Sequence, residues 1–193
     1  MKYTGINHFA MATADMDKTI MFWRDLLGMR MIAGLGEPGF RHYFFEIAAN
    51  DAIAFFEWDG VEAAEPRIHG TPVKGPFIFD HLSFGVESSD DLWELKDKLV
   101  AAGFPCTDVK DHGFIHSVYA HDPNGIPIEF SWPVDGVDIH QKPILADSLP
   151  SEIAKEGAEP QSARWPKVTK PTEENQKKII KSVGSELYHC LKK

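Results

Sequence analysis

The spacing of apolar residues along the chain predicts short strands and amphipathic helices in a repeated order. Two short apolar runs, residues 6–12 and 79–85, each carry a histidine at the third position, His8 and His81. A polar turn follows each run and leads into a segment whose apolar residues lie three and four positions apart, which is the pattern of a helix with one buried face. A glycine follows each of these segments, as expected at a helix end.

Three strand-like runs follow each predicted helix. In the first half they are MRMIAGL, RHYFFEIA and AIAFFEW, and in the second half CTDVK, FIHSVYA and IPIEFSW. A connector that contains proline and glycine, residues 61–78, separates the halves. Each half therefore has the order β-α-β-β-β. The chain is predicted to be α+β, with two repeats at approximately 5–60 and 78–133 that make one domain over residues 1–133.

The remainder of the chain is predicted to be an arm followed by a helix. Residues 134–171 contain five prolines and no sustained periodicity, so they are expected to be extended. Residues 172–193 carry apolar residues at helical spacing after Thr172, a suitable N-cap, and are predicted to form a C-terminal amphipathic helix. Its apolar stripe is expected to cover either the same chain or a second subunit.

Composition excludes several functional classes. The chain has 193 residues, 43% hydrophobic, and a net charge of −9, which argues against nucleic acid and anionic membranes as partners. Its two cysteines are too few for a disulfide framework or a thiolate zinc site. No apolar run has the length of a membrane span or a signal peptide. A cytoplasmic protein is expected.

One acidic residue stands in an apolar strand. Glu129 lies between Ile128 and Phe130, after the turn sequence Asp122-Pro123-Asn124-Gly125. A carboxylate is rarely buried unless another group pairs with it. Glu129 is therefore expected to have a specific partner.

The repeats, together with FWRDLLGM in the first half and DPNGIPIEF near the end, resemble the vicinal oxygen chelate superfamily. This group includes glyoxalase I, type I extradiol dioxygenases, and the fosfomycin- and bleomycin-resistance proteins. The resemblance covers residues 5 to about 133 and implies a half-open mixed barrel around one metal ion. It also implies that His8, His81 and Glu129 are the metal ligands, which would explain a buried Glu129.

The implied ligand set favours particular metals. Two imidazoles and one carboxylate leave open positions on Fe(II), and Mn(II) fits the same set, whereas zinc or nickel would need a fourth protein ligand. A lone histidine on an apolar strand is more often a hydrogen-bonded core residue than a ligand. Two histidines at equivalent positions of a repeat, together with the glutamate, favour the metal site.

The fourth ligand position separates the subclasses. Glyoxalase-like members use a glutamate on the last strand of the first repeat, where Glu57 is the candidate. Alignment of IAF with IEF instead pairs Ala54 with Glu129. Because side chains alternate along a strand, Glu57 is expected to face the other way. This favours a site with three protein ligands.

The stretch DHGFIHSVYAHDPNGIPIE resembles the extradiol dioxygenase signature. The resemblance implies that Tyr119 hydrogen-bonds a substrate oxygen and that His112 or His116 acts as acid or base. Lys110 departs from the pattern, and Asp51-Ala52 stands where those enzymes place a catalytic histidine.

His42 or His69 could replace that histidine. The expected function is an extradiol-type ring-cleaving dioxygenase that acts on a small aromatic diol or a similar vicinal-oxygen substrate. The alternatives are a glyoxalase-, isomerase- or lyase-like metalloenzyme, and a metal-free protein that binds a small molecule. Because dimers are common in the superfamily, a homodimer is expected.

Overall fold

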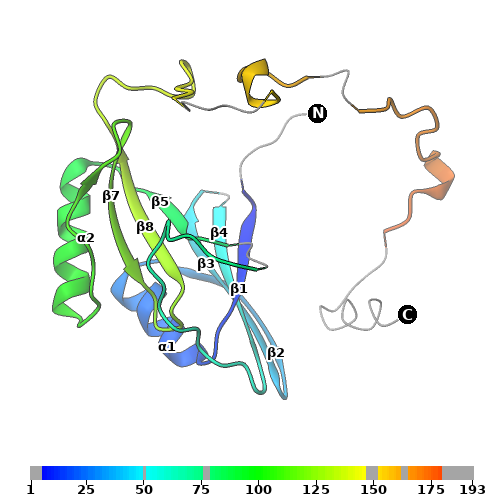
Figure 1. Ribbon diagram of the computed structural model, residues 1–193. Coiled ribbons are helices and arrows are strands. Elements are labelled where there is room, and N and C mark those ends of the chain that lie inside the picture. Colours follow the sequence, from blue (N-terminus) through cyan, green and yellow to red (C-terminus); the bar gives the residue numbers. More distant parts are fainter. Residues whose placement is uncertain (1–5, 50, 76–78, 147–151, 162–164, 180–193) are drawn as a thin grey trace. The chain divides into compact units, whose positions relative to one another are not determined.

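The computed structural model describes residues 6–49, 51–75, 79–146, 152–161 and 165–179 (Figure 1). By its internal contacts the chain divides into two compact parts, Met1–Pro143 and Ile144–Lys193. Among the described residues, no helix has both the length and the apolar character needed to cross a bilayer.

The first part contains both predicted repeats. The first repeat consists of β1 (His8–Ala12), α1 (Met16–Ile20), η1 (Met21–Leu26), β2 (Met31–Glu37), β3 (Phe40–Ala48) and β4 (Asp51–Trp58). The second consists of β5 (Leu82–Gly85), α2 (Ser89–Ala101), β6 (Lys110–Asp111), β7 (Ile115–His121) and β8 (Pro127–Pro133). The strand orders correspond, β1-β4-β3-β2 and β5-β8-β7-β6, and in each sheet the first strand runs parallel to its neighbour.

The two sheets are separate in their hydrogen bonding over the described residues, so no closed barrel forms. This agrees with the predicted α+β fold of two β-α-β-β-β repeats in a half-open arrangement.

Two elements differ from the sequence prediction. The first helix does not stay α-helical, because residues Met21–Leu26 form a π-helix in which Leu27 N donates to Phe22 O at 3.0 Å. Within this element the consecutive residues Phe22 and Trp23 are both buried. The predicted strand CTDVK is reduced to a single bridge from Cys106 and to β6.

The physical reason for the reduced strand lies at Thr107. Its side-chain Oγ1 accepts a hydrogen bond from Tyr119 N at 3.1 Å, while Thr107 N donates to Tyr119 O at 2.9 Å. A side chain thus takes the place of a backbone carbonyl, and the regular ladder is interrupted.

One hydrophobic core joins the two repeats. Trp23, which is fully buried, packs its ring 5.3 Å from that of Phe55 on β4 and 5.6 Å from that of Phe84 on β5. Phe22 packs edge-on against Phe104, just after α2, at 4.8 Å. Aromatic pairs of this kind contribute beyond the area that they bury, so the helix of the first repeat anchors the second repeat.

Buried polar groups also connect the repeats. Asn124 Oδ1, in the turn before β8, accepts from Thr13 Oγ1 at 2.7 Å and from Ala14 N at 3.0 Å. Asp122 Oδ2 accepts from Trp23 Nε1 at 3.3 Å. Burial raises the pKa of Asp122 above its ordinary value, although hydrogen bonds from Ile126, Asn124 and Trp23 oppose the shift. The turn sequence therefore serves to join the repeats as well as to reverse the chain.

The second part has little regular structure. Its helical elements among the described residues are the 3-10 turns η2 (Ala154–Glu156) and η3 (Glu174–Gln176). The predicted helix over 172–193 is therefore wrong for residues 172–179, where only η3 forms and Ile179 is exposed. Short helices depend on tertiary packing of an apolar face, and Ile179 makes no such packing. Residues 180–193 lie outside the described part of the chain.

Candidate metal centre

The second sheet places polar side chains in one row. Its pairing aligns Ser83 on β5 with Glu129 on β8, and Glu129 with Tyr119 on β7. Because side chains alternate along a strand, these three lie on one face, while neighbours such as Phe130 and Val118 are buried in the core on the other. This sheet face carries the candidate site.

Glu129 is buried and its carboxylate is only partly satisfied. The residue is 3% exposed, and its Oε2 lies 3.0 Å from His81 Nε2. Its Oε1 is buried without a hydrogen-bond partner among the described residues. An unpaired carboxylate oxygen inside a protein is costly. An imidazole nitrogen and a free carboxylate oxygen on one face are the donor types that divalent metals accept, so these residues fit a cation.

The surroundings of Glu129 favour its charged form. Burial alone would raise its pKa, but the hydroxyls of Ser117, Ser83 and Tyr119 and the ring of His81 outweigh burial, so the pKa of Glu129 lies below its ordinary value. These hydroxyls stabilise the charge without forming a hydrogen bond to Oε1. Glu129 is therefore ionised near neutral pH.

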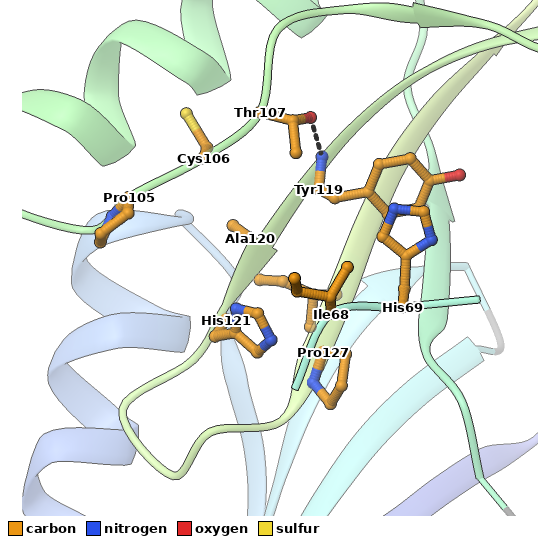
Figure 2. A pocket seen from close by; sticks show the side chains of 10 residues that line it. Ile68, His69, Pro105, Cys106, Thr107, Tyr119, Ala120, His121 and Pro127 are labelled. Atoms are coloured by element: carbon orange, nitrogen blue, oxygen red, sulfur yellow. Dashed lines mark hydrogen bonds between the residues drawn. The ribbon is translucent and has the colours of Figure 1, made fainter. Parts of the chain in front are cut away.

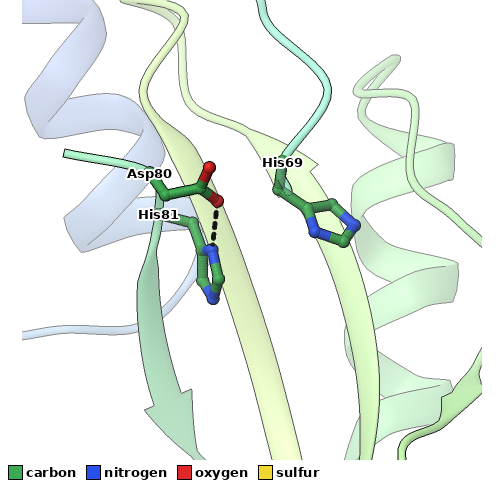
Figure 3. Close-up of side chains that lie close together, drawn as sticks. All are labelled: His69, Asp80 and His81. Atoms are coloured by element: carbon green, nitrogen blue, oxygen red, sulfur yellow. Dashed lines mark hydrogen bonds and ion pairs between the residues drawn. The ribbon is translucent and has the colours of Figure 1, made fainter. Parts of the chain in front are cut away.

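His81 is held from its other side by Asp80. Asp80 Oδ1 lies 2.7 Å from His81 Nδ1 (Figure 3). His69, from the connector between the repeats, lies close enough that its ring nitrogen, an oxygen of Asp80 and a nitrogen of His81 are all within 4.8 Å of one another. The hydrogen bond to His81 is the main reason that the pKa of Asp80 lies below its usual range.

Tyr119 connects several of these groups. Its hydroxyl lies 3.0 Å from His112 Nε2, and its ring stacks on that of His69 at a centroid distance of 3.5 Å. Burial, followed by the neighbouring Glu129, raises the pKa of Tyr119 to about 12. The phenol is therefore protonated and able to donate a hydrogen bond. Burial also lowers the pKa of His69, with a further contribution from His81.

A small apolar pocket adjoins the site. Its volume is about 280 Å³, and Tyr119 and His69 form one wall, with Ile68, Ala120 and Pro127 beside them (Figure 2). Pockets for small ligands are commonly apolar with a few polar groups at one side. This one has such a composition next to the candidate metal ligands.

His8 lies on the other sheet. Its Nδ1 is 2.8 Å from Asn7 Oδ1, and its ring packs edge-on against Phe44 at 5.4 Å. In the first repeat the row that corresponds to Ser83, Glu129 and Tyr119 is Ala10, Ala54 and Phe44. The structure brings His81 and Glu129 together but places His8 apart from them, and the first repeat has no carboxylate at the corresponding position.

Glu57 is engaged elsewhere. Its Oε1 accepts from Met16 N, at the start of α1, at 2.8 Å, and its Oε2 lies 3.2 Å from Arg41 Nη1. Glu57 therefore faces the helix, in agreement with the alternation argument. The carboxylate satisfies a free amide at a helix N-terminus, where negative charge is favourable.

The remaining candidate histidines are separated. His116 alternates with Tyr119 and faces the other side of the sheet, with its Nε2 3.7 Å from Asp111. His42 is buried on the first sheet, where its ring stacks on Phe56 at 3.5 Å. Of the predicted acid–base groups, the structure thus brings His112 and Tyr119 together, and of the two possible replacement histidines it places His69 near His81.

The sequence did not predict a role for Asp80. The only signal was its position directly before a candidate ligand, in FDH. An acidic residue adjacent to a histidine is common, and nothing local shows that its side chain turns back to the ring.

Sequence comparison finds known proteins that are similar to this chain. The sequence model of the Glyoxalase/Bleomycin resistance protein/Dioxygenase superfamily matches residues 5–130. The chain is 28% identical over 144 residues to biphenyl-2,3-diol 1,2-dioxygenase of Paraburkholderia xenovorans, a match that covers 69% of this chain and 43% of that protein. It is also 28% identical over 140 residues to lactoylglutathione lyase of Haemophilus influenzae, covering 65% of this chain and 90% of the lyase.

The fold has solved relatives. A glyoxylase/bleomycin resistance protein/dioxygenase domain from Frankia sp. EAN1pec superposes with a TM-score of 0.58 at 21% identity, covering 69% of this chain and all of that domain. The chain thus spans less than half the length of the dioxygenase but most of the lyase.

Proposed function

Because the chain belongs to the Glyoxalase/Bleomycin resistance protein/Dioxygenase superfamily, we propose that it is a mononuclear metal-dependent enzyme, an extradiol-type dioxygenase that cleaves a small aromatic diol. The observation that carries the proposal is the buried Glu129 carboxylate, which has one oxygen beside His81 and the other without a partner among the described residues. Fe(II) or Mn(II) is the proposed cofactor, since the donors are an imidazole and a carboxylate.

The third ligand is proposed to be His8. Its ring is exposed on the first sheet and apart from His81 and Glu129. We therefore propose a homodimer in which His8 from a second copy completes each site. Exposed apolar residues on the edge strand β2, Met31, Ile32 and Leu35, offer a surface that a second copy would cover.

The fourth position favours the dioxygenase. Ala54 occupies the position in the first repeat that corresponds to Glu129 in the second. Glu57 already contacts Met16 N at the start of α1 and the Arg41 side chain. A cation held by three protein ligands would have room for two vicinal oxygens of a substrate, and it would supply the positive charge that stabilises them.

The residues around these positions have matching roles. The Tyr119 hydroxyl is a protonated donor for a substrate oxygen, and His112, at 3.0 Å from it, fixes its direction and can exchange a proton through it. His69 covers the Tyr119 ring and limits the access of water. The adjoining apolar pocket would hold the hydrocarbon part of the diol.

A lactoylglutathione lyase-like activity is the second candidate. The observation that favours it is the share of each relative that the match covers, 90% of the lyase but 43% of the dioxygenase. Zinc or nickel would then be the expected metal, with a non-protein group at the fourth position.

Metal analysis with two assays tests the proposal. We expect protein purified without oxygen to contain iron or manganese, and to consume oxygen when biphenyl-2,3-diol or a simple catechol is added. Zinc or nickel, together with turnover of lactoylglutathione, would favour the lyase. Absence of metal and of both activities would leave a binding protein and contradict the proposal.

Tyr119→Phe and His112→Ala test the roles of the two hydrogen-bonded groups. Both variants should lower turnover of a responsive substrate by about 10²- to 10⁴-fold, the usual contribution of a positioned acid or base. Metal content should stay at the wild-type value, because neither side chain is a proposed ligand. His116→Ala, on the other face of the sheet, is the control and should retain wild-type turnover. Unchanged rates in Tyr119→Phe and His112→Ala would remove both groups from the mechanism.

A further inference from the structure

We propose that Asp80 is a positioning residue that keeps a proton on His81 Nδ1, and that the connector between the repeats holds Asp80 in place for this purpose. The inference rests on the proposed metal site, because it concerns the nitrogen that His81 offers to a cation. If the inference holds, residues of the connector support a ligand of the metal centre.

The first step concerns the two nitrogens of His81. Nδ1 lies 2.7 Å from Asp80 Oδ1, and Nε2 lies 3.0 Å from Glu129 Oε2. A histidine can bind a metal only through a nitrogen that carries no proton, and the hydrogen bond at the other nitrogen decides which one that is. With one proton held at Nδ1 by Asp80, Nε2 is the nitrogen left free to lose its proton. It faces Glu129 Oε2 at 3.0 Å, so a cation entering between these two atoms would meet the Nε2 lone pair.

The second step concerns the anchoring of Asp80. Arg67 Nη2 donates to Asp80 Oδ2 at 3.0 Å, and Gly70 N donates to the two carboxylate oxygens at 3.0 and 3.1 Å. Arg67 is itself fixed by a hydrogen bond from Nη1 to Thr71 O at 3.2 Å. A carboxylate held by a guanidinium and a backbone amide has little freedom to rotate away from the ring.

The third step concerns the position of the connector. Arg67 and Gly70 flank His69, whose ring stacks on Tyr119, so three neighbouring connector residues contact the site. His121 Nε2 fastens the same segment, since it lies 2.7 Å from Arg67 O. These contacts fix the connector against the second sheet, which a segment that only links two repeats does not require. They are the contacts expected of a segment that supports a metal-ligating histidine.

Chelator-competition titration with Mn(II) or Zn(II) tests the inference. Asp80→Ala should weaken metal binding about 10- to 100-fold, as loss of such a support usually does. Asp80→Asn, which keeps an acceptor oxygen, should restore part of the affinity. Arg67→Gln should weaken binding by a smaller factor in the same direction. The control is Asp108→Ala, which removes an exposed carboxylate paired with Lys96 and should bind metal as wild type does.

Nitrogen-15 NMR of His81 supplies a readout that does not depend on activity. The proton should be on Nδ1 in the metal-free and the zinc-loaded protein, and should leave Nδ1 in metal-free Asp80→Ala. Wild-type affinity together with an unchanged Nδ1 proton in Asp80→Ala would overturn the inference. If wild-type protein binds no divalent metal, the proposed function fails, whereas the NMR result still decides the role of Asp80. Melting temperatures of the variants separate these effects from unfolding.

Discussion

Glu129→Gln is expected to cause a large loss of metal binding, as are His8→Ala and His81→Ala, which remove the other proposed ligands. The glutamine keeps the size of the side chain but removes the charge that balances a divalent cation. Loss of a residue that merely supports a ligand costs about 10- to 100-fold in affinity, and loss of a ligand should cost at least as much. Metal content after purification and Mn(II) titration would measure the effect.

Glu57→Gln is the matched control for this experiment. It makes the same chemical change on β4, the corresponding strand of the first repeat, at a residue that contacts α1 and Arg41. It should therefore retain wild-type metal affinity. Equal loss in both variants would mean that the site has four protein ligands, and the lyase would then replace the dioxygenase as the better proposal.

Gly125→Ala is expected to lower the stability of the fold strongly, although it adds only one methyl group. Gly125 has φ +74°, and an added Cβ would lie 2.1 Å from the backbone oxygen of Ala64 in the connector. The left-handed backbone costs roughly 1–2 kcal/mol with a side chain, and the contact forces the connector to move. A total of about 2–4 kcal/mol should lower Tm by roughly 5–15 °C.

Gly136→Ala separates strain from contact. Gly136 has nearly the same backbone angle, φ +76°, and an added Cβ would meet nothing within 4 Å. Thermal unfolding of this control should show the strain alone. If the two variants lose the same stability, the connector is not fixed by its approach to Gly125.

The sequence predicted the local elements well because their signals are local. Alternation and helical spacing placed the strands of both repeats, and the alignment of Ala54 with Glu129 agrees with the pairing of β1 with β4 and of β5 with β8. Glu57 is three residues beyond Ala54, so the alternation of side chains correctly predicted that it lies on the other face of β4.

Contacts between distant segments were not predictable in this way. The bond from Thr13 to Asn124 joins residues 111 positions apart, and no periodicity carries that information. The same holds for Arg67 and Asp80, which meet only because the connector folds back over the second sheet. The tail shows a different kind of error, since the helix predicted over residues 172–193 is replaced by the short turn η3 within residues 172–179, and residues 180–193 lie outside the described part of the chain.

The corresponding rows of the two sheets differ in chemistry, apolar in the first and polar in the second, so substitutions in them have different effects. A substitution at Ala54 or Phe44 alters packing in a row of apolar side chains, whereas one at Glu129 or Tyr119 alters the charge and hydrogen bonding of the corresponding row of the second sheet. Substitutions in this row of the second repeat would therefore change the charge at the candidate site, whereas substitutions at Ala54 or Phe44 would change only the packing on the sheet that carries His8.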